Sequence, residues 1–568
     1  MLYILKRELK ATLQGITVIP RANLSVYRKV FSLLSKKEKT LALLLLIFAS
    51  LTPLLRTKSS DNKATTPNTT QRSYKEGIVG VPEYFNPVLA STNAERSISA
   101  LTARGLYSYN EHSELIPELA TTLPELSSNN KEYTIHLKPN QLWQDGSLIS
   151  ADDVLFTFNL VKNPEIKSPY YSFAQNTEIE KIDESTVKFK TKGVSAPFIH
   201  NLTLPLISKA HWGEFSPSQF KDASKNINNI FSNGPYQLSS ESSSPNHIIF
   251  KSNNYSSSHP LILNVELVFF SNVNDSVTAF DSKQIDSVSW ISTDTSPTRQ
   301  PIRQHIQTYH FPIPQYQVIF FNNQARPFND KRLRQALKIA TDKQEILTIA
   351  HENAGSISAG PLVPEQLGYI KATTSTSTIT EAGILLDKAG WKKDETGFRT
   401  KNLTPLSVKI ATDFNPRNVK TAQILKKQWS NLNINVEIET YSIDKLLDNV
   451  IRPRNFDILL FSQKIDADPD PFAFWHSSQI ADPGLNFAGF ANPQADSDII
   501  KGRTTFKEAD RIKAYQDFQK VITEEAPAIF LIEDEFVFIA DEEIGNISTT
   551  TLWHPSNRLL QLPIWTWQ

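Results

Sequence analysis

The stretch WQDGSLISADDVLFTF at residues 143–158 holds the signals for the end of a strand, a tight turn and the start of a helix. Within it, Asp145-Gly146 is a dipeptide that favours a tight turn. Ser150 is a good helix N-cap, and two aspartates follow it in what would be the first turn. The stretch therefore predicts a strand–turn–helix unit whose helix begins after Ser150.

Strands and helices alternate on both sides of this unit. Alternating apolar residues predict strands at Tyr133–Leu137, Val187–Lys190, Asn264–Phe270 and Asn433–Glu439. Apolar residues at helical spacing predict helices at Asp330–Ala340, with Asp330 as N-cap, at Glu381–Ala389, ended by Gly390, and at Asn418–Leu432. No repeat of about 20–50 residues accompanies this alternation, so it favours α/β lobes over a solenoid.

The chain is long and its charge is unevenly distributed. At 568 residues it exceeds one compact core, so we expect two or three lobes. The overall net charge is zero, but residues 1–39 carry nine lysines and arginines against two glutamates, and the remainder is mildly acidic. A nucleic-acid-binding protein would instead show a basic domain, so that class is excluded.

Residues Leu41–Leu55 form an apolar run without a charge, which admits three interpretations. These are a buried core helix, a cleaved signal peptide and an uncleaved anchor; fifteen residues are short for a spanning helix and fit a signal-peptide core equally well. The charged flanks disfavour the core helix, while the long basic tail and the lack of an A-x-A cleavage site favour the anchor. We therefore predict a basic cytoplasmic tail at 1–39, a transmembrane signal anchor at 40–56, a flexible linker at 57–73 and a single-pass protein of the cell membrane whose body is extracytoplasmic.

Motifs for catalysis and metal binding are lacking in the sequence. There is no cysteine, which excludes disulfides, thiol nucleophiles and a lipoprotein anchor. There is also no H-E-x-x-H, G-x-S-x-G or Walker motif, and the S-x-x-K at 185–188 falls in an alternating strand segment. Asp466, Asp468 and Asp470 alternate as at the start of a calcium loop, but two prolines and the missing Gly and Glu do not fit one. We expect a protein that is not an enzyme and has no cofactor or metal.

Five segments, in order, resemble the peptide/nickel family of ABC-transporter solute-binding proteins, which includes the oligopeptide- and dipeptide-binding receptors. They are the W-x-D-G…A-x-D-V pattern at 143–158, SNGPYQL at 232–238, VIFFNNQ…PFND at 318–330 with the helix after it, LLDKAGW at 385–391 and FDILL at 456–460. The resemblance covers roughly residues 76–560 and leaves out the N-terminal tail.

The resemblance implies a two-lobed, three-domain α/β fold of the large peptide-binding periplasmic type, preceded here by the membrane segment. Domain I would comprise 74–107, 230–317 and 536–568, domain II 108–229, and domain III 318–535. Such a receptor captures a peptide in the interdomain cleft by hinge closure and delivers it, as a monomer, to the permease subunits of an ABC importer. The alternatives are a receptor of the same fold for a nickel chelate, haem or sugar, and a binding or signalling protein not coupled to transport. A cleft histidine beside an arginine would favour a metal chelate, and no such pair is visible in the sequence.

The resemblance also implies ligand-binding positions. These are Ala90, Ser91 and Asn93 in a first-domain loop, Tyr170 and Tyr171 in a second-domain loop, Trp290, Ser462, Gln463 and Asp466, and Asn486 with Phe487 in the third domain. The carboxylate with which the family binds a peptide amino group falls on Ile465, when counted back from Asp468-Pro469. Either a shift of one residue lets Asp466 bind the amino group, or the amine is held in another way.

Overall fold

A computed structural model describes residues 72–242, 244–292, 297–371 and 378–568. The predicted tail at 1–39, the anchor at 40–56 and nearly all of the linker at 57–73 lie outside these residues. None of the helices in the described part of the chain has the length and apolar character that a membrane span requires.

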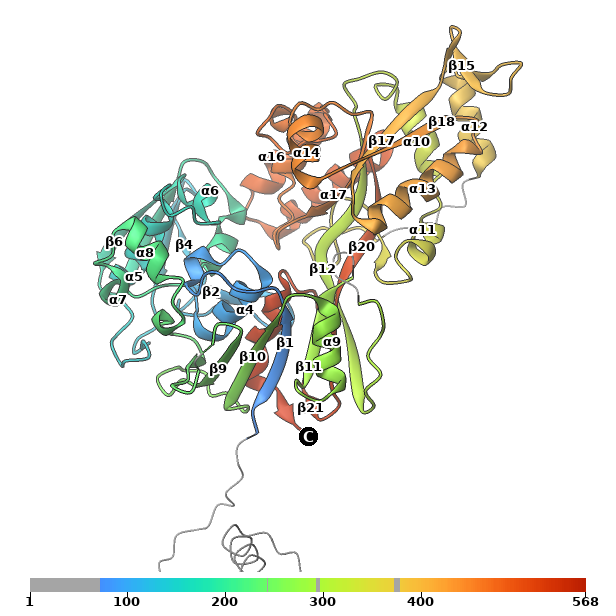
Figure 1. Ribbon diagram of the computed structural model, residues 1–568. Coiled ribbons are helices and arrows are strands. Elements are labelled where there is room, and N and C mark those ends of the chain that lie inside the picture. The colour runs from blue at the N-terminus through green and yellow to red at the C-terminus, as the bar shows by residue number, and fades with distance from the viewer. Residues whose placement is uncertain (1–71, 243, 293–296, 372–377) are drawn as a thin grey trace, which may run out of the picture. The chain divides into compact units, whose positions relative to one another are not determined.

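A mixed sheet of eleven strands forms the centre of the described fold (Figure 1). The strands follow the order β18, β17, β19, β12, β20, β11, β1, β10, β9, β8, and β13 also pairs with β20. Their bounds are β1 Tyr74–Val79, β8 Tyr236–Leu238, β9 His247–Ser252, β10 Asn264–Phe270, β11 Ser287–Ile291, β12 Ile306–Phe321, β13 Ser356–Ile357, β17 Ser407–Asp413, β18 Asn435–Tyr441, β19 Ile458–Lys464 and β20 Ala528–Asp541. Because β1 runs parallel to β10 and β11, and β17 parallel to β18 and β19, these strands need crossover connections.

The two longest strands, β12 and β20, connect the two halves of this sheet. They pair antiparallel with each other, while β12 also pairs with β19 at one end and β20 with β11 at the other. Their register shifts between Pro312 and Tyr316, and again between Gln317 and Val318. Pro312 and Pro314 have no backbone N–H to donate, so the ladder is interrupted there. The predicted domain boundaries at 317/318 and 535/536 both fall inside these strands.

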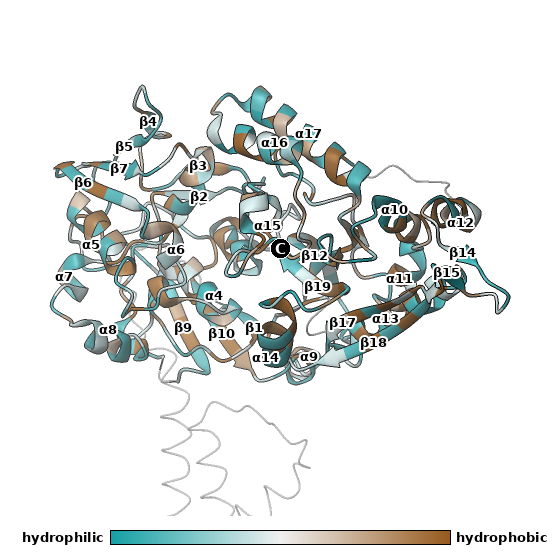
Figure 2. Cartoon of the chain, turned by 90° about the horizontal axis from the view of Figure 1, so that it is seen from above, coloured by the Kyte–Doolittle hydropathy of each residue, from teal (hydrophilic) through white to brown (hydrophobic). Residues whose placement is uncertain are grey.

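A separate sheet of four strands, in the order β4, β5, β7, β6, lies with α5–α8 to one side (Figures 1 and 2). Their bounds are β4 Glu125–Leu126, β5 Glu132–His136, β6 Thr177–Asp183, β7 Thr186–Thr191, α5 Ala151–Val161, α6 Tyr171–Ala174, α7 Lys209–Trp212 and α8 Pro217–Ala223. The turn and the helix of the predicted strand–turn–helix unit are confirmed here, but only an isolated bridge between Leu142 and Leu148 stands where the strand was expected. Gly146 has φ +84°, and Ser150 and Asp153 form a capping box at the start of α5.

The other helices flank the large sheet or connect its strands. They are α4 Asn93–Thr102, α9 Val273–Asp281, α10 Lys331–Ile339, α11 Lys343–Ile349, α12 Ile379–Lys388, α13 Pro416–Ser430, α14 Ile443–Leu446, α15 Phe472–Trp475, α16 Pro493–Thr504 and α17 Glu508–Glu525. Short 3₁₀ helices include η2 Ala196–Thr203 and η6 Pro555–Leu560, and a hairpin joins β2 Tyr107–Tyr109 to β3 Leu115–Pro117.

The predicted elements exist, with shifts at some ends. β10 has the predicted bounds, and Asp330 caps α10. Gly390 follows α12 with φ +87°, as a glycine after a helix end should. α13 begins two residues early because Asn415 caps it and Pro416 suits its first turn. β18 begins late because Asn433 adopts φ +62° in the preceding turn.

Hydrophobic packing forms several clusters. One joins segments far apart in the chain, including Tyr74, Phe250 and Trp565. A second lies within residues 88–220, around Trp143, and two more lie within residues 316–532. In Figure 2, α5–α8 lie on one side of α15 and α10–α13 on the other. The formal division into three domains stays a prediction.

One ion pair lies at the centre of the first cluster. Arg558 of η6 donates from Nε to Glu76 Oε1 of β1 at 2.8 Å, and both side chains are fully buried. The Tyr74 hydroxyl donates to Glu76 at 2.8 Å, and the guanidinium lies 4.9 Å from the centroid of the Phe536 ring. This pair joins strand β1 to a segment 482 residues later in the chain.

We predict that Arg558→Ala lowers the free energy of unfolding by about 3–5 kcal/mol, because it leaves the Glu76 carboxylate buried without its partner. Urea unfolding measures this. The control is Arg452→Ala, which breaks an exposed pair with Asp448 and should cost less than about 1 kcal/mol. Equal urea midpoints for the wild type and Arg558→Ala would contradict the prediction.

Candidate ligand-binding site

A cavity of about 620 Å³ opens where several segments meet. Its walls come from α4, β2, η2, the start of α6, the loop that follows β19, α15 and η6. This volume is within the range of sites that take a small ligand. Residues far apart in the sequence therefore line one space.

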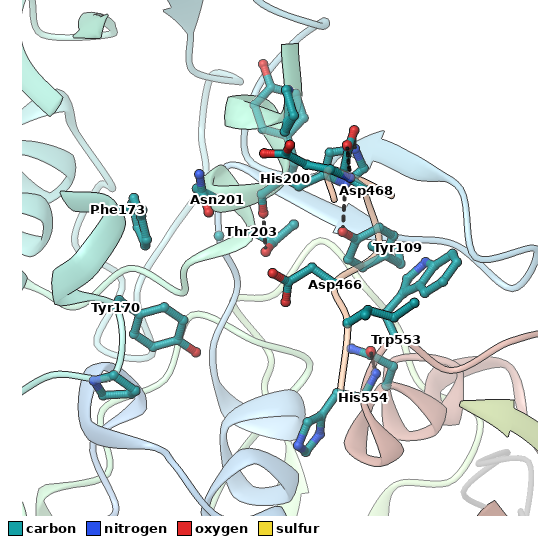
Figure 3. A pocket seen from close by; sticks show the side chains of 18 of the residues that line it. Tyr109, Tyr170, Phe173, His200, Asn201, Thr203, Asp466, Asp468, Trp553 and His554 are labelled. Atoms are coloured by element: carbon teal, nitrogen blue, oxygen red, sulfur yellow. Dashed lines mark hydrogen bonds and ion pairs between the residues drawn. The ribbon is translucent and has the colours of Figure 1, made fainter. Parts of the chain in front are cut away.

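Aromatic side chains form much of the wall. Tyr109, Tyr170, Phe173 and Trp553 surround the space in Figure 3. The ring centroids of Tyr109 and Trp553 lie 6.3 Å apart, and Trp553 Nε1 donates to the backbone oxygen of Ser113 at 2.8 Å. Such walls offer apolar surface with a few polar groups at fixed positions.

A hydrogen-bonded network connects two sides of the cavity. The Tyr109 hydroxyl lies 2.9 Å from His200 Nδ1, and His200 Nε2 lies 3.5 Å from Asp468 Oδ2 (Figure 3). Arg511 donates to both Asp468 oxygens, at 3.0 and 2.7 Å. Burial lowers the pKa of His200, although Asp468 opposes this. The network thus links the segment predicted as domain II, which ends at 229, to the segment predicted as domain III, which begins at 318.

Asp466 presents to the cavity a carboxylate that pairs with none of the described residues. In Figure 3 it points toward the part of the cavity that holds Tyr170 and Thr203. Among the described residues its side chain forms no hydrogen bond or ion pair, while its backbone oxygen accepts from Gln366 Nε2 at 2.6 Å. The carboxylate is open to the cavity but surrounded by protein, and this desolvation raises its pKa against the opposing effects of His200 and Arg96. A cation bound here would compensate the charge.

Gln463 offers an amide to the same cavity. It lies at the end of β19 and is buried, and neither its Oε1 nor its Nε2 has a hydrogen-bond partner in the described part of the chain. Buried amides of proteins are normally hydrogen-bonded. This side chain can therefore donate to a ligand carbonyl and accept from a ligand N–H.

The structure brings three of the predicted site residues to the cavity: Tyr170, Gln463 and Asp466. Ala90, Ser91, Asn93 and Tyr171 do not line it. Local contacts keep the first-domain loop away from the cavity. The backbone N–H of Ser91 donates to Glu95 Oε2 at 2.9 Å and closes the loop onto the start of α4.

The remaining predicted residues also lie off the cavity. Trp290 of β11 is buried in a cluster with Val537 and Ile539. Asn486 is buried and donates to three backbone oxygens, and Phe487 packs edge-on against Phe320. Ser462 pairs with Gln317 within the sheet. These four side chains pack inside the protein or pair within the sheet and are absent from the walls of this cavity.

Several lining residues were missed in the sequence. Tyr109, His200, Trp553 and His554 lie in short or irregular segments without a periodic pattern. Arg96 lies in a short amphipathic helix, where the sequence pattern predicts that a charged residue is exposed to solvent. His554 and Arg96 both line the cavity, so a histidine and an arginine share this site although the sequence did not reveal it.

A family model described as bacterial extracellular solute-binding proteins, family 5, middle, matches residues 114–482. The chain belongs to this family. It is 25% identical over 485 residues to the dipeptide-binding protein of Escherichia coli K12, covering 80% of this chain and 87% of that protein.

Two solved structures share the mixed α/β fold of this family 5 protein. One is the oligopeptide-binding protein AppA from Bacillus subtilis in complex with a nonapeptide, at 21% identity and a TM-score of 0.65, covering 88% of this chain and 99% of that one. The other is NikZ from Campylobacter jejuni in complex with Ni(L-His), at 22% identity and a TM-score of 0.65, covering 87% and 99%. The expected α/β solute-binding-protein fold is therefore confirmed for the described body, while its division into three domains stays a prediction.

Charged residues are also buried beside the crossing of β12 and β20 in this family 5 protein. Glu533 of β20 pairs with Tyr316 and accepts from Ser356 Oγ at 3.2 Å. Nearby, Lys343 Nζ donates to the Ser358 backbone oxygen at 2.9 Å. Burial raises the pKa of Glu533 to about 7 and lowers the pKa of Lys343 to about 8. An ionised Glu533 therefore destabilises the fold.

This yields a pH-dependent prediction for Glu533→Gln. The folded protein keeps the proton on Glu533 up to about pH 7, whereas the unfolded chain loses it near pH 4.5, the ordinary pKa of a glutamate. Stability from this group is thus present at low pH and is lost as the pH rises from 4.5 to about 7. The glutamine variant lacks this loss, so its free energy of unfolding relative to the wild type should rise by about 1–3 kcal/mol between pH 5 and 7.5.

Urea unfolding at both pH values measures the effect. The control is Glu165→Gln, the same substitution at an exposed position. A constant difference for Glu533→Gln would show that Glu533 does not titrate in this range.

Proposed function

We propose that this protein is the extracytoplasmic substrate-binding receptor of an ABC importer and that it captures peptides in the cavity around Asp466. The observation that carries the proposal concerns two side chains of the cavity: within the described residues the Asp466 carboxylate makes no hydrogen bond or ion pair, and the Gln463 amide has no hydrogen-bond partner. A peptide supplies the matching groups, an amino-terminal ammonium for Asp466 and a backbone amide for Gln463. The names of related proteins, a dipeptide-binding protein and an oligopeptide-binding protein, agree with this chemistry.

Binding would proceed by closure of two lobes around the peptide. In the proposed division, domains I and III would share the large sheet, in which β12 pairs with β20, and domain II would carry Tyr109 and His200, whose side chains are in contact. A ligand that contacts both sides stabilises the closed arrangement more than the open one, which is the condition for ligand-driven closure. The closed receptor, a monomer, then meets the permease subunits.

The second candidate ligand is a metal chelate, as in the NikZ complex with Ni(L-His). The observation that favours it is the presence of His554 and Arg96 in one cavity. However, the backbone N–H of Ser556 donates to His554 Nδ1 at 3.2 Å, so the neutral ring carries its proton on Nε2. A protonated Nε2 donates a hydrogen bond and has no lone pair for a metal, which favours the peptide.

If Asp466 binds the peptide amino group, Asp466→Asn weakens peptide binding at least about tenfold, or roughly 1.4 kcal/mol, because the ammonium loses its counter-charge. Calorimetric titration with a mixed peptide pool measures this. Thermal unfolding of the ligand-free variant should match the wild type, and Asp448→Asn, at an exposed position, should bind as the wild type does. Equal affinity in Asp466→Asn would show that the amino group is held elsewhere.

We further propose that residues 40–56 anchor the protein in the cell membrane, with the basic tail inside and the body outside. Nine cations precede the apolar run, and only Arg56 and Lys58 closely follow it. Protease added to intact cells should therefore digest the body and spare the tail. A body that survives in intact cells and is digested only after lysis would refute this topology.

A further inference from the structure

His200 lies in the cavity wall at the place where two sides of the cavity meet. It belongs to η2, in the segment predicted as domain II, and its side chain lines the cavity and is 26% exposed. Its Nδ1 lies 2.9 Å from the Tyr109 hydroxyl of β2, and its Nε2 faces Asp468, in the segment predicted as domain III, at 3.5 Å (Figure 3). The imidazole therefore bridges the two sides, and its protonation state bears on both contacts.

The neutral ring fits these two partners. The Asp468 carboxylate offers only acceptors to Nε2, so the proton of the neutral ring lies on Nε2, and Nδ1 accepts from the Tyr109 hydroxyl. Protonation of Nδ1 turns this nitrogen into a donor, and the Tyr109 hydroxyl must then direct its hydrogen to another acceptor. The chain of contacts from Tyr109 to Asp468 therefore belongs to the neutral ring.

The carboxylate that faces His200 is already paired with another cation. Arg511 of α17 donates to both oxygens of Asp468, at 3.0 and 2.7 Å, in a buried contact. A positive charge on His200 would find the negative charge of Asp468 offset by the positive charge of Arg511. The cross-cavity contact thus gives an imidazolium little compensation for its desolvation.

Two further groups of charges surround η2. Asp466, in the loop after β19, favours a positive charge on His200, but in the proposed complex the ligand ammonium would bind this carboxylate. Both β2 and α16 pack against η2, and the cavity-lining arginine of α16, Arg503, lies 3.5 Å from Asp470. That pair is neutral as a whole, so it does not compensate a charge on His200.

A ligand in the cavity would disfavour protonation of His200 further. It would cover the exposed part of the ring, and its ammonium would add a positive charge at Asp466, and both changes oppose the imidazolium. Burial already lowers the pKa of His200, although Asp468 opposes this. Ligand binding and protonation of His200 therefore compete.

We propose that His200 couples ligand release to acid: its neutral form bridges the two sides of the closed cavity, and its protonation favours opening and loss of the ligand. The proposal rests on the proposed function and adds a regulatory proton to it. A group that binds its proton more weakly in the ligand-bound form weakens ligand binding as the pH falls, because proton and ligand affect each other reciprocally. A histidine places this effect between about pH 5 and 8.

The test is the pH dependence of peptide affinity, measured by calorimetry at pH 7.5 and pH 5.5 with the purified full chain in detergent. The probe is a pool of tripeptides without histidine, aspartate or glutamate. Their carboxyl termini stay charged over this range and their amino termini only gain charge in acid, so a loss of affinity in acid comes from the protein. If His200 titrates at its ordinary pKa of 6.5 in the open form and stays neutral in the closed form, the affinity falls about tenfold. We expect a fall of about three- to tenfold in the wild type, since burial reduces the effect.

Four variants assign this fall. His200→Gln should bind with the same affinity at both pH values, whereas the matched control His305→Gln, at an exposed position, should show the fall in full. Asp466→Asn should bind more weakly throughout but show the same fall, which excludes titration of Asp466 as its cause. His554→Gln should also show it, because burial, with the charges of Arg96, Lys464 and Arg558, holds the pKa of His554 well below its ordinary value.

The outcomes separate this inference from the function on which it rests. Equal wild-type affinity at both pH values would overturn the role of His200 and leave peptide capture standing. A fall that persists in His200→Gln, or that disappears in Asp466→Asn, would also overturn it. Binding of no peptide at either pH would overturn the proposed function and this inference together.

Thermal unfolding at both pH values checks that each variant folds. If His200→Gln does not fold, Arg511→Gln decides. Removal of the guanidinium leaves Asp468 free to pair with a protonated His200, so the fall in affinity should shrink. A fall in Arg511→Gln as large as that of the wild type would overturn the inference.

Discussion

The architecture depends on the pairing of β12 with β20. Each strand continues through both halves of the sheet, so the backbone hydrogen bonds of one half extend into the other. Two covalently continuous strands leave only a narrow set of relative movements, essentially bending and twisting about the crossing. The register shifts and the two prolines lie at this crossing, where the ladder is least regular. This irregular stretch lies beside the cavity, since the backbone N–H of Ile465 in the cavity wall donates to the Pro314 oxygen.

The cavity owes its character to charges that the protein does not neutralise itself. Elsewhere in and around it the ionic groups are paired, as in the contacts of Arg511 with Asp468 and of Arg104 with Glu118. Asp466 and Arg96 have no such ion pair among the described residues, because charged side chains close to them in the sequence bind other groups. The Asp466 side chain is exposed to the cavity, and the surrounding protein desolvates its carboxylate in part. A ligand of opposite charge would therefore gain free energy by pairing with it.

Local signals in the sequence were sufficient for local structure. The serine–aspartate cap of α5, the alternation of β10 and the glycine after α12 act within a few residues, and each was predicted correctly. The strand at 318 was predicted, but not its start at Ile306, because Pro312 and Pro314 argue against a strand.

The candidate site was predicted only in part, for a physical reason. Tyr170, Gln463 and Asp466 lie in loops or strand ends that the family resemblance located. Arg96 and His554 meet only through the packing of α4 on η6, which joins parts of the chain about 450 residues apart. No pattern within either segment reports that contact.

The buried pair of Glu76 and Arg558 has a consequence for biogenesis. Its two members are separated by nearly the whole described chain, and the segment that carries Arg558 also supplies Trp553 and His554 to the cavity wall. During synthesis β1 is made early, whereas η6, which carries its partner Arg558, is made late. The contacts of this cluster therefore have a large sequence separation and form last. Until then the Glu76 carboxylate and the apolar surface around it are accessible to solvent and to chaperones. A nascent or truncated chain without residues 553–560 therefore cannot form the cavity. The apolar surface that stays exposed in such a chain is also a binding site for chaperones.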